Sequence, residues 1–180
     1  MMKFLSTLVL FCFVAAVCRA DVESGPKAGE KVGELKVSVV VGEKEGKDLD
    51  YAAERKEEPT IYLFVNAEKF SRPMARFMKK IDEKIGDVND KAEAVAVVVG
   101  GDVTMWKDRL PKIQMSLKFV KTSMSVHDGA EPKGWGINSD AHITAVVVAK
   151  GKVVKSFAFV SVNEKDEEAV MEAFANAVKK

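Results

Sequence analysis

Two short, uninterrupted apolar runs with an amphipathic segment between them constrain the fold of this chain most strongly. Residues 60–65 (TIYLFV) lie between Pro59 and Asn66, and residues 94–99 (AVAVVV) form the second run. Runs of this length and composition predict strands that are buried on both faces of a sheet. Between them, residues 72–85 place apolar side chains at spacings of three and four, which predicts a helix. The three segments together predict a parallel strand pair joined by a right-handed crossover.

The remaining segments predict a single α/β domain. Further strands are expected at residues 34–41 (near a sheet edge), 119–126, 143–149 and 152–160, the last two forming a hairpin. Further helices are expected at residues 50–58, 104–118 and 164–178. Pro111 should kink or split the second of these helices, and Asn163 should cap the third. The combination predicts a mixed sheet with helices on both faces.

Both cysteines of the chain, Cys12 and Cys18, lie within its first twenty residues. That segment has a basic start, an apolar run over residues 4–17 and small residues shortly before Asp21, which predicts a signal peptide at residues 1–20. A retained membrane anchor is the alternative, although the apolar run is shorter than the roughly 20 residues that span a bilayer. With cleavage before Asp21, we expect an exported protein, periplasmic or secreted, that contains no thiol.

Cleavage would leave an extended lead-in at residues 21–33 and a domain at residues 34–180. A chain of this length suits one hydrophobic core. Lys3 and Arg19 are the basic residues that cleavage removes, so 26 basic residues would face 27 acidic ones. A nearly neutral surface has no general attraction for nucleic acid or anionic lipid. We therefore expect no nucleic-acid partner and, after signal cleavage, no stable membrane span.

The order of these elements resembles the thioredoxin fold, and the segment after residues 60–65 carries part of the likeness. Thioredoxin-like proteins have an apolar strand followed by Trp-Cys-Gly-Pro-Cys at the start of a helix. Here the strand leads to Phe70-Ser71-Arg72-Pro73-Met74, in which the aromatic residue and the proline fit the pattern. Ser71 stands where the nucleophilic cysteine would be, and Met74 stands where the resolving cysteine would be.

The hairpin and the long connections add to the resemblance. The family has a cis-proline at the start of the hairpin, where this chain has Ile143. We expect a trans bond there, because a cis bond before a residue other than proline costs about 2.5–4 kcal/mol. The lead-in 25–41, with residues 28–33 as its opening motif, and the connection 100–142 resemble the redoxin and peroxiredoxin branch. The resemblance implies a thioredoxin-like mixed β-sheet flanked by helices. The family's chemistry needs a thiolate, and the departures from the pattern predict a fold without its redox centre.

Each candidate site residue has a structural and a functional interpretation. Ser71 is interpreted as a helix cap, and the alternative is an activated hydroxyl with His142 as its base. Arg72 belongs to a basic cluster that is either a solvated helix face or a contact for an anion or a partner. Trp135 lies in a glycine-rich loop, where it either binds a ligand through an exposed ring or closes over the core. Trp106 is expected in the core.

The sequence offers no metal-ligand set and no cofactor motif, so we expect neither a metal nor a cofactor. The leading hypothesis is a non-catalytic binding or scaffolding module for an extended peptide or protein. Its binding residues would stand at the vestigial active-site positions: Phe70, Ser71, Arg72, Pro73, Met74, Trp135, His142 and Ile143. The resemblance implies the rival hypothesis, a thiol-disulfide oxidoreductase or a peroxiredoxin-like redox protein. A structural protein of the cell envelope is a third.

Overall fold

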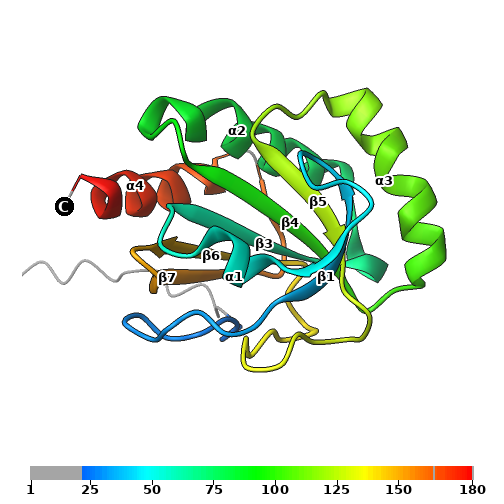
Figure 1. Ribbon diagram of the computed structural model, residues 1–180, viewed down its shortest axis with the longest axis horizontal. Coiled ribbons are helices and arrows are strands. Elements are labelled where there is room, and N and C mark those ends of the chain that lie inside the picture. Colours follow the sequence, from blue (N-terminus) through cyan, green and yellow to red (C-terminus); the bar gives the residue numbers. More distant parts are fainter. Residues whose placement is uncertain (1–21, 164, 180) are drawn as a thin grey trace, which may run out of the picture.

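A seven-stranded mixed sheet forms the centre of the molecule (Figure 1). The computed structural model describes residues 22–163 and 165–179. The strands follow the order β2-β1-β5-β4-β3-β6-β7 across the sheet. Their bounds are Lys36–Val41 (β1), Asp48–Asp50 (β2), Thr60–Asn66 (β3), Glu93–Val99 (β4), Thr122–Val126 (β5), Ile143–Ala149 (β6) and Lys152–Phe159 (β7).

The three strands β5, β4 and β3 run parallel, and every other neighbouring pair in the sheet is antiparallel. Helix α2 (Arg72–Val88) connects β3 to β4, and helix α3 (Val103–Leu117) connects β4 to β5. The predicted parallel pair is therefore confirmed, and the pairing of β4 with β5 extends it by a third strand. The β6–β7 hairpin is also confirmed.

Helices α2, α3 and α4 (Asp166–Val178) pack on one face of the sheet. Side chains from all three belong to one core cluster with alternate residues of β3, β4 and β6. Their contribution includes Met74, Phe77, Met78, Ile81 and Ile85 from α2, Trp106 and Leu110 from α3, and Val170, Met171 and Phe174 from α4. Burying this many large apolar side chains at about 1.5–3 kcal/mol each supplies most of the favourable free energy of folding.

The opposite face of the sheet is covered by the short helix α1 (Tyr51–Arg55) and by loop residues. A second cluster on this face contains Tyr51, Tyr62, Phe64, Trp135 and Ile137 among its members. The lead-in also ties to this side, because Ser24 Oγ lies 2.7 Å from Thr144 Oγ1. Helices occupy both faces as predicted, but their distribution is uneven, since α1 has only five residues.

Several local expectations need correction. Strand β2 was not predicted, because three residues are too few for a periodic signal. Helix α3 continues from Val103 to Leu117 through Pro111, so of the two predicted outcomes, a kink or a split, the split is wrong. Helix α4 begins at Asp166 rather than at residue 164, and Lys165 is its N-cap. Asn163 still forms a hydrogen bond just before the helix, since its Oδ1 accepts the Lys165 N–H at 2.9 Å.

The predicted signal peptide, with Cys12 and Cys18, lies outside the described residues. Within the residues that the structure describes, no helix combines the length and apolarity needed to cross a bilayer.

Candidate functional site

The candidate site lies where β3 ends and α2 begins. Asn66, the last residue of β3, starts the one-turn helix η1 (Ala67–Lys69), and its Oδ1 accepts the Glu68 N–H at 3.0 Å. The backbone N–H of Asn66 donates to the carbonyl of His142 at 3.0 Å, and Val65 pairs with Ile143 across the sheet. The structure therefore brings the start of β6 to the end of β3, as the thioredoxin resemblance implies.

Ser71 occupies the N-cap position of α2 with an extended backbone (φ −141°, ψ 165°). Its carbonyl accepts the Ala75 N–H at 3.1 Å, so the residue starts the helix as predicted. Its side chain, however, makes no capping hydrogen bond. Pro73 lies in the first turn, where a missing N–H costs nothing. The half-buried Ser71 and the exposed Arg72 and Pro73 thus form an accessible corner.

Met74 and Ile143 point into the core instead of lining that corner. Both have 0 % exposure and belong to the cluster beneath α2. The peptide bond before Ile143 is trans, as expected, because none of the described residues has a cis bond. Met74 therefore contributes to stability where the family pattern has a cysteine.

His142 is held through its backbone. Its N–H donates to the Phe159 carbonyl at 2.7 Å, and its own carbonyl accepts from Asn66. No hydrogen bond connects the described side chains of Ser71 and His142. A serine nucleophile needs a base within about 2.6–3.2 Å, so the geometry gives no support to the hydrolytic interpretation.

Trp135 belongs to the core on the opposite face from α2. Its ring is 1 % exposed and lies 5.0 Å from the Tyr62 ring and 4.8 Å from the Phe64 ring, measured between centroids. Its Nε1–H donates to the Glu34 carbonyl at 3.0 Å. The interpretation of an exposed ligand-binding ring is therefore wrong, and the alternative of a ring closing over the core is correct.

Sequence reasoning missed an arginine that stacks on two aromatic rings beside Ser71. The Arg109 guanidinium carbon lies 4.6 Å from the Trp106 ring centroid and 5.3 Å from that of Phe70. The Phe70 and Trp106 rings meet edge to face at 5.5 Å. Trp106 is fully buried, as expected. The three-residue spacing of Trp106 and Arg109 on α3 was visible, but their approach to Phe70 depends on the packing of α3 against α2.

An open groove between α2 and α3 adjoins this stack. Its volume is about 410 Å³, and its lining residues are Phe70, Arg72, Ala75, Arg76, Ile113, Ser116 and Leu117. Phe70 and Arg72 flank Ser71 in the sequence, so the groove begins at the candidate site. The sequence could not predict this groove, because its lining residues come from two helices and the pattern of one helix does not show which helix lies beside it.

A second polar cluster lies at the opposite end of β3 and β4, away from Ser71. The Tyr51 hydroxyl donates to Glu93 Oε1 at 2.5 Å, and Arg55 Nη1 lies 2.9 Å from Glu93 Oε2. Burial, with the Glu93 charge as the next cause, raises the pKa of Tyr51 above its ordinary value of 10.0. Arg55 also donates to the Lys91 carbonyl at 2.6 Å. These contacts hold α1 against the sheet.

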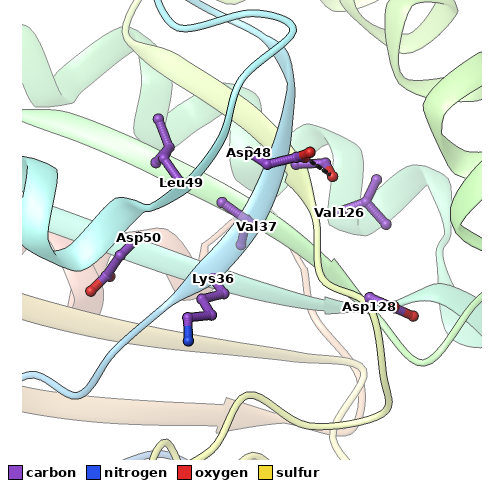
Figure 2. A pocket seen from close by; sticks show the side chains of 8 residues that line it. Lys36, Val37, Asp48, Leu49, Asp50, Val126 and Asp128 are labelled. Carbon is purple, nitrogen blue, oxygen red and sulfur yellow. Dashed lines mark hydrogen bonds between the residues drawn. The ribbon is translucent and has the colours of Figure 1, made fainter.

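A cavity of about 340 Å³ lies beside the edge strand β2 and its neighbour β1 (Figure 2). Three of its lining residues are acidic, but Figure 2 shows the carboxylate of Asp50 pointing away from those of Asp48 and Asp128. Asp50 caps α1, and Asp48 accepts a hydrogen bond from Ser38. Among the described residues, no three His, Cys, Asp or Glu side chains are grouped so that they could hold a metal ion.

Comparison with known proteins gives structural matches only. No protein-family model and no curated protein sequence matches the chain. A proposed protein disulfide isomerase from Bacteroides thetaiotaomicron is similar over 88 % of this chain and 96 % of its own, with a TM-score of 0.65 and 15 % identity. A secreted thiol-disulfide isomerase from Corynebacterium glutamicum is similar over 83 % and 86 %, with a TM-score of 0.60 and 11 % identity.

A peroxidoxin, BcpB, from Mycobacterium tuberculosis is similar over 83 % of this chain and 97 % of its own, with a TM-score of 0.58 and 11 % identity. Structural matches at identities this low show the fold but do not show the chemistry. The strand order, the crossover helices and these neighbours together show that the chain has the thioredoxin-like α/β fold.

Proposed function

We propose that this chain is an exported thioredoxin-like binding module with no thiol redox chemistry of its own. The observation that carries the proposal is the pair of residues at the start of α2. Ser71 occupies the N-cap, where the family pattern has its nucleophilic cysteine, and Met74 is buried in the core. Residues 22–163 and 165–179 contain no cysteine. A serine hydroxyl cannot replace a thiolate in disulfide exchange.

The proposed binding surface is the accessible corner formed by Ser71, Arg72 and Pro73, with Phe70 beside it. Arg72 and Pro73 are exposed, and Phe70 is half-buried. Such a surface combines an aromatic face, a fixed backbone and a cation. These features suit an extended peptide or a protein segment as the partner. Met74, Ile143 and Trp135 are buried, so they would support this surface instead of contacting the partner.

Export rests on the sequence of residues 1–20, and the secreted neighbour from Corynebacterium glutamicum agrees with it. N-terminal sequencing and intact mass measurement of the native protein test this part of the proposal. We expect a mature chain that begins at Asp21. A native protein that retains Cys12 and Cys18 would contradict the thiol-free assignment.

Insulin reduction and peroxide reduction test the absence of redox chemistry. We expect the purified full chain to match the rate of a buffer blank in both assays, and the variant with Cys12→Ser and Cys18→Ser to behave identically. A genuine thioredoxin-like enzyme serves as the positive control. Thiol titration of the denatured native protein should find no reactive thiol.

The alternative function is that of a thiol-disulfide oxidoreductase or a peroxiredoxin-like protein. The names of the structural neighbours favour it. In this chain it would need Cys12 or Cys18 to be retained, or a thiol that a partner supplies. Full-chain activity that disappears in the variant lacking both cysteines would establish the first form of this alternative and overturn our proposal.

A further inference from the structure

Arg109 is positioned by aromatic rings and not by a carboxylate. Its guanidinium lies against Trp106 and Phe70, and no acidic partner of Arg109 occurs in the described part of the chain. Stacking uses the faces of the planar guanidinium, so the N–H donors on its edge stay available. An arginine held in this way is oriented in advance for an anionic group.

Arg72 adds a second cation without an acidic partner. It is exposed at the start of α2, and it forms no ion pair with any of the described residues. None of the seven residues that line the groove between α2 and α3 is acidic. The acidic residues Asp82 and Glu83 of α2 lie further along the helix, where they pair with Lys79. The Ser71 end of the groove is therefore positively charged.

The groove also has an apolar floor. Phe70, Ile113 and Leu117 line it and are each half-buried. Its volume of about 410 Å³ falls within the range of ligand sites, roughly 300–1,000 Å³. A ligand that used the whole groove would therefore place an apolar group on the floor and an anionic group at the end where Arg72 lies and where Arg109 stacks on Phe70.

We propose that this groove binds an extended acidic peptide segment in which a carboxylate side chain neighbours an apolar one. The carboxylate contacts Arg72 and the edge of Arg109, and the apolar side chain packs on Phe70, Ile113 and Leu117. The proposal rests on the proposed function of a binding module and names its partner class. Charge complementarity selects this occupant: Arg72 and Arg109 have no acidic partner among the described residues, and none of the residues that line the groove is acidic.

Selection from a random peptide library tests the preference without assuming a sequence. The immobilised full chain is the bait, and matched baits carry Arg72→Glu, Arg109→Glu or Lys107→Glu. Lys107 is an exposed cation of α3 that does not line the groove, so its variant changes the net charge equally. We expect enriched peptides to combine Asp or Glu with Leu, Ile or Phe. Affinity should fall about tenfold or more in each arginine variant and change less than twofold in the Lys107 variant.

The two tryptophans report where a selected peptide binds. Trp106 touches Arg109, whereas Trp135 lies on the opposite face of the sheet. In an NMR titration of the full chain, we expect the indole N–H signal of Trp106 to shift and that of Trp135 to stay. Arg72→Glu keeps the test valid if Arg109→Glu unfolds the protein, because Arg72 is exposed.

Four results would overturn the proposal: no enrichment, enrichment of basic or uncharged peptides, equal losses in the Lys107 variant, or a shift of Trp135 alone. Binding to anionic phosphatidylserine vesicles with no peptide preference would also overturn it, because it would assign the cations to a membrane surface. Insulin reduction by the full chain would refute the proposed function while leaving this peptide result measurable, so the two failures are distinguishable.

Discussion

Substitution of the buried Asp82 should destabilise the protein more than any other single change to a charged residue of α2. Its Oδ1 accepts the backbone N–H groups of Val120 at 3.0 Å and Lys121 at 2.8 Å, and the Thr122 hydroxyl at 2.9 Å. Its Oδ2 lies 3.1 Å from Lys79 Nζ. One carboxylate therefore joins α2 to the segment that enters β5.

The magnitude follows from the donors that Asp82→Ala leaves without a partner. Two backbone N–H groups and one hydroxyl at about 1 kcal/mol or more each give a loss of about 3–4 kcal/mol in the free energy of unfolding. Asp82→Asn keeps the shape and one acceptor oxygen but turns an NH₂ group toward donors, so we expect about 2 kcal/mol. These losses are large against a total stability of about 5–15 kcal/mol.

Urea unfolding followed by circular dichroism measures the effect. With a slope of about 2 kcal/mol/M, a loss of 3 kcal/mol would lower the midpoint by about 1.5 M. The matched control is Glu83→Gln on the next residue of α2. The Glu83 side chain is half exposed and lies 3.9 Å from Lys79 Nζ, so its loss should cost less than about 0.5 kcal/mol. A change below 0.5 kcal/mol for Asp82→Ala would refute the reasoning.

Three further predictions concern ionisation, backbone space and the helix terminus. Burial raises the pKa of both tyrosines, Tyr51 and Tyr62, above 10.0, so the stability that their neutral forms confer is complete below pH 10 and declines as the pH rises beyond it. Tyrosinate absorbance should appear at higher pH in the folded chain than in urea, and coincident curves would contradict this. Gly101→Ala should lower the melting temperature, because the added Cβ would lie 2.5 Å from Ala67 Cβ and 2.7 Å from Trp106 Nε1. Gly33→Ala, whose Cβ would meet nothing within 3.5 Å, should change it little, and equal shifts for the two would refute the steric argument. Ser71→Cys should give a thiol with a pKa below about 8.5, because it would stand at the N-terminus of α2, whose first turn has no acidic residue. The pH dependence of alkylation measures it, and an ordinary thiol pKa would argue against this placement.

The central strands could be predicted from the sequence because strands that are buried on both faces consist of continuous apolar runs. Thr60–Asn66 and Glu93–Val99 agree with the predicted runs to within one residue at each end. The ends of α4 and the short strand β2 were harder to predict from the sequence. They depend on local hydrogen bonds, such as the one from the Lys165 N–H to Asn163, that leave no periodic signal.

The candidate site was only partly predictable, because a sequence motif gives the positions of residues along an element but not the directions in which their side chains point. The pattern placed Ser71 at a helix start correctly, but it could not show that its hydroxyl makes no capping bond. Trp135 looked accessible in a loop with several glycines, yet packing on Tyr62 and Phe64 buries it. The stack of Arg109 on Phe70 joins residues on separate elements, so a single sequence without an alignment contained no signal for it.

If the proposed binding surface is correct, the first turn of α2 separates stability from recognition by the direction of its side chains. Met74 points into the core with 0 % exposure and contributes the roughly 1.5–3 kcal/mol of a buried apolar side chain. Arg72 and Pro73 point to solvent and contribute little to the core. A thioredoxin-like enzyme places its chemistry on this same turn, whereas here the buried position is a stabilising methionine and the exposed positions offer a cation. Because the buried and exposed residues occupy opposite sides of one turn, the proposal predicts that substitutions at Arg72 alter binding without altering the free energy of unfolding. Coupled losses at Arg72 would show that the exposed side is also structural.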